Sequence, residues 1–176
     1  MAFAVLSVDC ISSLGEVQKN KHQWRCSCSF CIMDTGGMKR AFEVIDHTAD
    51  VGIIAYGRDI EELFCNAALA LFSLITDPES IQEKSHLNLK VSSDEIDSLL
   101  VEWLNELIYF FDAKHILFNR FDIESLTQNK LKATCHGEGF DPVKHKIKRG
   151  VKAATYHMLS LDKNNDGYKA QIIFDI

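Results

Sequence analysis

The sequence lacks the signatures of several protein classes. No apolar run approaches the roughly 20 residues that a membrane-spanning helix needs, and Met1–Leu6 has no basic segment before it, so nothing indicates an export signal. Neither a G-x-x-x-x-G-K-S phosphate loop nor a G-x-S-x-G nucleophile elbow occurs. With a net charge of -6, the chain also lacks the positive field that holds nucleic acid by counterion release. These absences argue against a membrane protein, a nucleotide or serine hydrolase, and a direct RNA-binding protein.

The composition is that of an ordinary globular domain. Of the 176 residues, 47% are hydrophobic and 25% are charged, which allows one domain with a proper core. Six cysteines are present, but Cys65 falls on the apolar face of a predicted helix and Cys135 in a predicted strand. Such positions suit reduced thiols in a cytoplasmic compartment. We therefore expect a cytoplasmic protein without structural disulfides.

Residues 1–40 differ from the rest of the chain. They mix Ser, Gly, Gln and Lys with four cysteines and show no sustained period of 2 or 3.6 residues. Cys26, Cys28 and Cys31, with His22, cluster in a zinc-like way but lack the two well-spaced pairs of a firm zinc motif. We interpret 1–40 as an N-terminal extension, either a disordered arm or a segment preceding an alternative start at Met38, and 41–176 as the domain.

The sequence of residues 41–176 predicts strands and helices that alternate along the chain. Asp59 and Glu62 give a capping-box-like helix start, and Asp77-Pro78 closes that helix because a residue before proline disfavours helical geometry. We expect strands at 42–45 and 51–56, a helix from 60 to about 75, a strand at 86–91, a helix with apolar residues from 96 to 111, and strands at about 117–126, 130–136, 151–161 and 168–174. This order predicts a two-layer α+β sandwich, mostly antiparallel, with both long helices on one face.

Three short segments, in this order, resemble the archease family: His47-Thr48-Ala49-Asp50, Lys152-Ala153-Ala154-Thr155-Tyr156-His157 and the final Asp175-Ile176. The resemblance covers roughly Ala41 to Ile176. It implies a small cytosolic or nuclear protein that assists the GTP-dependent RNA ligase of tRNA splicing. Archeases promote guanylylation of that ligase, so that the ligase turns over repeatedly.

The resemblance also implies a metal site. Asp50 alone would be interpreted as a turn or cap residue, and Asp175 alone as part of a frayed chain end. In the archease pattern the two carboxylates meet and bind the metal together with the main-chain oxygens of Ile176. Oxygen-only coordination favours Ca²⁺ or Mg²⁺ over zinc, and the family suggests calcium.

Further polar residues have two interpretations each. His47 would bind the metal or orient one of its ligands, or it would simply be hydrogen-bonded within its turn. Lys152 and His157 face opposite sides of one predicted strand, and either they offer a polar surface to the ligase or they are ordinary sheet residues. The basic run of Lys144, Lys146, Lys148 and Arg149 is either a solvated loop or a contact with RNA or an acidic ligase surface.

One segment partly matches the calcium-binding loop of a helix-loop-helix motif. Asp162, Asn164, Asp166 and Gly167 copy the first half of a calcium-binding helix-loop-helix, but the twelfth position is Ile173 and the flanking segments read as strands. We interpret it instead as a hairpin turning at 164–167, where Asp-Gly supplies positive φ values.

These patterns favour a metal-binding accessory factor that is not itself an enzyme and that meets RNA only through its partner, the ligase. Two alternatives stay open at this point. One is a small divalent-metal enzyme using Asp50 and His157, and the other is a chaperone-like binding module for RNA-modifying enzymes.

Overall fold

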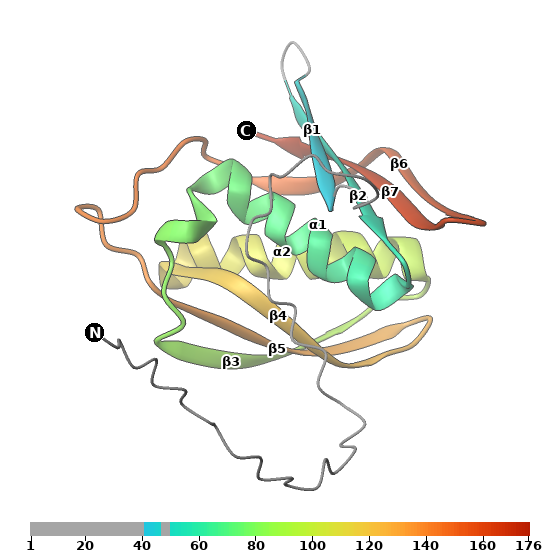
Figure 1. Cartoon of the computed structure of the whole chain (residues 1–176), viewed down its shortest axis with the longest axis horizontal. Helices are drawn as coiled ribbons and strands as arrows, with labels where there is room; N and C mark the ends of the chain where they lie inside the picture. The colour runs from blue at the N-terminus through green and yellow to red at the C-terminus, as the bar shows by residue number, and fades with distance from the viewer. Residues whose placement is uncertain (1–40, 47–49) are drawn as a thin grey trace, which may run out of the picture.

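The computed structural model describes residues 41–46 and 50–176. Figure 1 shows the chain, whose elements are β1 (Phe42–Asp46), β2 (Val51–Gly57), α1 (Ile60–Ile75), the short 3₁₀ turn η1 (Pro78–Ser80), β3 (Ser85–Ser92), α2 (Ile96–Lys114), β4 (Ile116–Leu126), β5 (Lys130–Gly139), β6 (Ala153–Asn164) and β7 (Gly167–Asp175).

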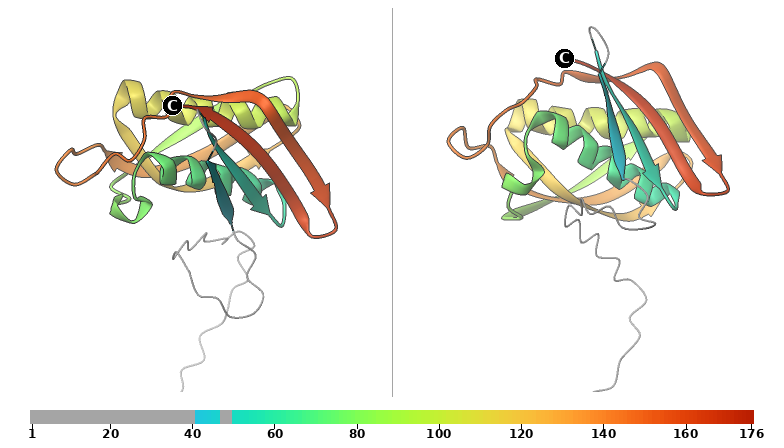
Figure 2. Two further views of the ribbon diagram at one scale, coloured as in Figure 1. Left: turned by 90° about the horizontal axis from the view of Figure 1, so that it is seen from above. Right: turned by 45° about the horizontal axis from the view of Figure 1, so that its top comes forward.

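The strands form two antiparallel sheets with the helices between them. Sheet A has the order β1-β2-β7-β6 and sheet B the order β3-β5-β4. Each helix contacts strands of both sheets, as Figures 1 and 2 show. The expected α+β class and antiparallel pairing are confirmed. The arrangement differs from two layers with helices on one face, because the strands divide into two sheets and the helices are covered on two sides.

The burial of α1 explains this arrangement. Its buried residues fall on consecutive positions, from Leu63 to Ala68 and from Ala70 to Phe72, and not on a single stripe. A helix that is apolar nearly all round requires cover on more than one side. One sheet cannot supply that cover, and the second sheet does.

Both helix starts carry local caps. Asp59 accepts a hydrogen bond from the Glu62 main-chain N–H at 2.8 Å, and the Glu62 carboxylate accepts from the Arg58 main-chain N–H at 2.7 Å. The hydrogen bond from the Arg58 side chain lowers the pKa of Glu62. At α2, Glu95 and Ser98 form a capping box. The predicted helix starts are therefore confirmed.

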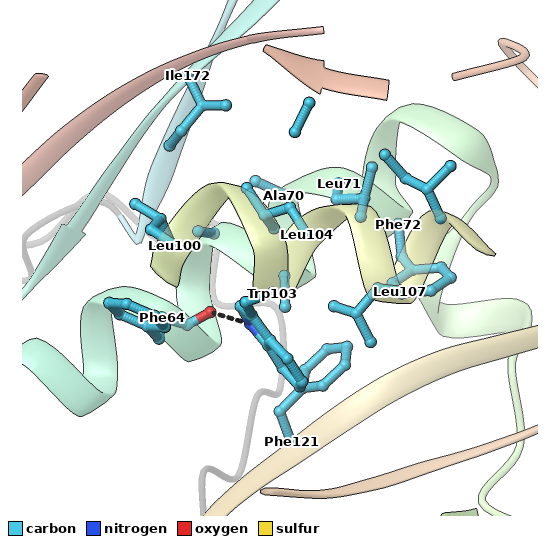
Figure 3. Packing of buried hydrophobic residues seen from close by; sticks show 14 of the residues in the cluster. Phe64, Ala70, Leu71, Phe72, Leu100, Trp103, Leu104, Leu107, Phe121 and Ile172 are labelled. Carbon is cyan, nitrogen blue, oxygen red and sulfur yellow. Dashed lines mark hydrogen bonds between the residues drawn. The ribbon is translucent and has the colours of Figure 1, made fainter. Parts of the chain in front are cut away.

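The core centres on Trp103 of α2, drawn in Figure 3. Its side chain is fully buried, and its indole N–H donates to the Phe64 main-chain oxygen of α1 at 3.3 Å. The ring meets Phe121 of β4 edge-on, with centroids 5.9 Å apart. This one side chain therefore joins both helices to sheet B.

The β6–β7 hairpin corrects one detail of the predicted turn. The register pairs Asn164 with Gly167, so only Asn165 and Asp166 lie in the loop. Gly167 has φ +127, whereas the non-glycine residues with positive φ in the described part are His115 and Met158. A Cβ at Gly167 would lie 2.3 Å from the Gly57 main-chain oxygen. The segment that imitates a calcium loop is thus a tight hairpin between strands.

Cys65 and Cys135 are both free and buried. The Cys65 thiol donates to the Phe121 main-chain oxygen at 3.3 Å, and burial, with the nearby Asp122 charge, raises the pKa of Cys135. The other four cysteines, and the predictions made for 1–40, lie outside the described residues. In the part of the chain that the structure describes, no helix is long and apolar enough to cross a membrane.

Candidate functional site

Three adjacent strand ends bring the C-terminal residues beside the start of β2. The register pairs Val51 of β2 with Phe174 of β7, and Ala153 of β6 with Asp175 of β7. In Figures 1 and 2 the C-terminus accordingly lies at the β1–β2 end of sheet A. The Lys152 main-chain N–H donates to the Asp175 main-chain oxygen at 2.8 Å, which extends the pairing by one residue.

Asp50 precedes Val51 and Asp175 follows Phe174, so continuing the register by one residue would bring the two aspartates opposite each other. Directly opposed residues have Cβ atoms about 5 Å apart, and like charges in such positions repel. Asp50 is half-buried, whereas Asp175 is exposed. A cation close to both carboxylates would offset that repulsion.

Lys152 supplies one positive charge to this end of the sheet. Its ammonium donates to the main-chain oxygen of Ile176 at 2.9 Å. Ile176 is 45% exposed. We refer to Asp50, Lys152, Asp175 and Ile176 together as the strand-end site.

The donor set of the strand-end site fits a hard divalent cation chemically. It offers two carboxylates and main-chain oxygens of Ile176, which are oxygen ligands of the kind that Ca²⁺ and Mg²⁺ take. Within residues 41–46 and 50–176 no three His, Cys, Asp or Glu side chains gather closely enough to hold a metal ion. A cation here would therefore need main-chain oxygens and water to complete its coordination.

The sequence predicted two histidines, His47 and His157, near the strand-end site, and the structure describes only the second. His47 lies outside the described residues. His157 lies four residues along β6 from Ala153, about 13 Å at the usual rise of a strand. It is exposed, and its main-chain N–H donates to the Thr155 hydroxyl at 3.3 Å. The structure thus brings Lys152, but not His157, to Asp175, and the pairing of Asp50 with His157 in a metal enzyme gains no geometric support.

Comparison with known proteins identifies the family. The model of the archease protein family matches residues 42–176. The chain belongs to the archease family. It is 38% identical to an archease of Methanosarcina mazei over 141 residues, covering 78% of this chain and 97% of that protein, and 39% identical to an archease of Sulfolobus acidocaldarius over 136 residues, covering 77% and 98%.

Two solved structures share the archease fold. A solution structure from Methanobacterium thermoautotrophicum superposes with a TM-score of 0.68 at 37% identity, covering 77% of this chain and 99% of that one. A crystal structure of an archease from Thermotoga maritima, described as a possible chaperone, superposes with a TM-score of 0.55 at 23% identity, covering 81% and 100%. The second likeness concerns the fold alone.

Beyond the strand-end site, β6 of this archease carries an irregular stretch. Its register with β7 shifts between Thr155 and Ser160, and Met158 has φ +52. The Tyr156 hydroxyl donates to Glu102 of α2 at 3.2 Å, and burial together with this carboxylate raises the pKa of Tyr156. Ala154 is buried and the Tyr156 hydroxyl reaches α2, so these two side chains lie on the side of β6 that faces this helix.

A buried carboxylate that sequence reasoning missed lies beside the basic run. Glu138 is 4% exposed and accepts from the Gln82 main-chain N–H at 2.6 Å and from Lys84 at 2.7 Å, with a further bond from Lys144. Burial opposes ionisation of Glu138, but these donors outweigh it and lower its pKa to about 2. Glu138 is therefore a buried anion with two lysine partners.

His145 completes this cluster. It is 1% exposed, and its Nδ1 accepts from the Asp141 main-chain N–H at 3.0 Å. The proton of the neutral ring is therefore on Nε2, which lies 3.3 Å from the Glu138 carboxylate and donates to it. The basic run was interpreted as a solvated loop or as a contact with RNA or an acidic ligase surface, yet Lys144 and His145 bond to the buried Glu138. The one sequence feature that could have indicated the buried carboxylate is its position, a single acid between Gly137 and Gly139 at the end of a predicted strand.

Proposed function

We propose that this chain is a metal-binding accessory factor of the GTP-dependent RNA ligase of tRNA splicing. It promotes guanylylation of the ligase and allows multiple turnover, and it meets RNA only through the ligase. Membership of the archease family supports this proposal, as does the description of the Thermotoga maritima archease as a possible chaperone. A chaperone-like role implies action through contact with a partner enzyme and not through chemistry of its own.

The observation that carries the proposal is the geometry of the strand-end site. Residues from the first and last parts of the domain converge there on three adjacent strand ends. Lys152, Asp175 and Ile176 are exposed, so a partner protein can reach them. Asp175 lies on β7, and Asp50 and Lys152 directly precede β2 and β6, so the strands limit the movement of residues that must fit against another protein.

We further propose that Asp50, Asp175 and the main-chain oxygens of Ile176 hold Ca²⁺, with Mg²⁺ as the other ion that this donor set accommodates. When bound, the ion supplies a local positive charge with coordination positions open to oxygen groups of the partner. Lys152 orients the main-chain oxygen of Ile176, and Asp50 directly precedes β2 at the end where β7 finishes.

Metal binding is tested by calorimetric titration of the full chain with CaCl₂ and with MgCl₂. Asp50→Ala and Asp175→Ala should each weaken the affinity at least tenfold. Asp162→Ala is the matched control, since Asp162 is an exposed aspartate near the far end of the same sheet. Equal affinities in all four proteins would remove the ion from the strand-end site.

The ligase function is tested by counting ligation events per ligase molecule with and without this chain, under excess RNA substrate. The proposal expects single turnover without it and many turnovers with it. If the chain does not stimulate the ligase at any concentration, the proposed ligase function is overturned. RNA processing by the chain alone, without ligase, would favour the alternative of a metal enzyme.

A general binding module for RNA-modifying enzymes is the second candidate, favoured by the description of the Thermotoga maritima relative as a possible chaperone. Such a module would protect several unrelated enzymes from aggregation. Light scattering of heated ligase and of a heated unrelated enzyme separates the two, because a ligase-specific factor affects only the first.

A further inference from the structure

The connection between β5 and β6, residues 140–152, is anchored although it contains neither helix nor strand. We refer to it as the β5–β6 loop. The Lys148 main-chain N–H donates to the Ile75 main-chain oxygen at 2.8 Å, and the Thr76 hydroxyl donates to the Lys146 main-chain oxygen at 2.9 Å. The far side of the loop is therefore fixed to the end of α1.

The first half of the loop is fixed by hydrogen bonds between its own residues. The His145 main-chain N–H donates to the Asp141 main-chain oxygen at 2.7 Å, and the Val143 N–H donates to the Asp141 carboxylate at 2.9 Å. Beneath them lies the buried cluster of Glu138, Lys144 and His145. The loop therefore has a defined shape in the absence of any partner, which reduces the entropy lost on binding.

This fixed loop holds aliphatic side chains out in solvent. Val143 is 95% exposed and Ile147 is 38% exposed. An exposed aliphatic residue on a surface is ordinary. Here, however, two of them are displayed by an anchored loop, in which the one aromatic residue, Phe140, is turned inward against Phe111 and the His145 ring.

The charge around these aliphatic residues is positive. Lys146 and Lys148 are exposed and flank Ile147. The Asp141 carboxylate accepts a hydrogen bond within the loop, and the charge of Lys144 is compensated by Glu138. The loop is thus a positive region on a chain whose net charge is -6. Complementarity requires an acidic partner surface.

We propose that the β5–β6 loop is a docking surface for an acidic protein surface that carries an apolar recess for Val143 and Ile147. For the identity of that protein the proposal rests on the function above, so the partner is the ligase. A protein fits these observations better than RNA, because single-stranded RNA is held by stacking on aromatic side chains and the aromatic rings of this loop pack inward.

The position of the loop adds to the argument. It ends at Lys152, whose main-chain N–H is paired with the Asp175 main-chain oxygen. A partner seated on the loop is therefore held next to the strand-end site. The loop supplies affinity, and the strand-end site acts on the partner so positioned.

The test uses the double variant Val143→Asp/Lys146→Glu in the full chain. Both side chains are exposed, so the fold should be retained, and circular dichroism checks this. Binding to the purified ligase is measured by calorimetry over a series of salt concentrations. The double variant should bind at least tenfold more weakly and show a shallower salt dependence than the unchanged chain.

The matched control is Val44→Asp/Lys90→Glu, which makes the same charge changes at an exposed valine of β1 and an exposed lysine of β3. It should bind the ligase as the unchanged chain does. Ligase binding by Val143→Asp/Lys146→Glu that equals that of the control would overturn the docking surface.

Two further arms separate this proposal from the proposed function. Asp50→Ala should keep the salt dependence of ligase binding, which the loop determines, yet fail to stimulate the ligase. If the unchanged chain neither binds nor stimulates the ligase, the function is overturned and the docking proposal with it. If the unchanged chain stimulates the ligase and the loop variant does so equally at low concentration, only the docking proposal is overturned.

A loop variant that loses affinity for a labelled tRNA half, while keeping its affinity for the ligase, would assign the loop to RNA instead.

Discussion

Glu138 shows how far the environment of a single residue can depart from what its neighbours in sequence suggest. Two glycines and a strand end surround it in the chain, yet in the fold it is buried and accepts bonds from Gln82, Lys84 and Lys144. Its donors come from a segment more than 50 residues away as well as from the adjacent loop. Local sequence patterns carry no information about such a partner set, which explains why this cluster was missed.

At the scale of the residue, we predict that Glu138→Gln lowers the free energy of unfolding by about 2 kcal/mol at pH 7. Hydrogen bonds to a charged group usually contribute a free energy of this size. The pKa of Glu138 is depressed from 4.5 to about 2 in the folded chain. Its contribution is therefore fully present above pH 4.5 and is lost as the pH falls toward 2.

Urea denaturation of both proteins at pH 7 and at pH 3 measures this difference. The gap between the unchanged chain and Glu138→Gln should narrow at pH 3. A gap that stays constant between the two pH values would show that the charge of Glu138 does not stabilise the fold.

At the scale of the element, the sequence predicted most boundaries well and the sheet arrangement poorly. The helix start at 60 follows from a local cap in the sequence, and it is confirmed. The division into two sheets depends on contacts between distant segments, such as Trp103 with Phe64 and Phe121. Hydrophobic periodicity shows that a face is buried, but it does not show which element covers that face.

The β6–β7 hairpin gives a prediction at this scale. Gly167→Ala should cost about 1–3 kcal/mol, because it places a Cβ in a positive-φ conformation and against the Gly57 main-chain oxygen. Gly150→Ala is the control, since a Cβ there meets nothing within 4 Å, and it should change stability by less than about 0.5 kcal/mol. Thermal unfolding of both variants provides the comparison, and equal melting temperatures would contradict the proposed constraint.

At the scale of the whole molecule, the strand-end site joins the two ends of the domain. The sequence motif placed Asp50 and Asp175 in one site only through the resemblance to archeases. The register of β2 with β7 pairs their chain neighbours, Val51 and Phe174. The metal stays a prediction. The role of His157 stays one too, although the strand places it away from Asp175.

Removal of residues 1–37 should leave both the melting temperature and the stimulation of the ligase nearly unchanged, because the family model begins at residue 42 and the described core lies in the remaining chain. Zinc content is measured on both forms by atomic absorption. A stoichiometric zinc that is lost on truncation, together with a large fall in melting temperature, would instead assign Cys26, Cys28 and Cys31 a structural role.

The measurement that tests the central claim most directly is ligase turnover in the presence of three forms: the unchanged chain, Asp50→Ala and Asp162→Ala. Asp50 lies at the edge of β2 outside the core, so its replacement should leave the melting temperature within a few degrees of that of the unchanged chain. The account predicts at least a tenfold loss of stimulation for Asp50→Ala and none for Asp162→Ala. Full stimulation by a folded Asp50→Ala protein would contradict it.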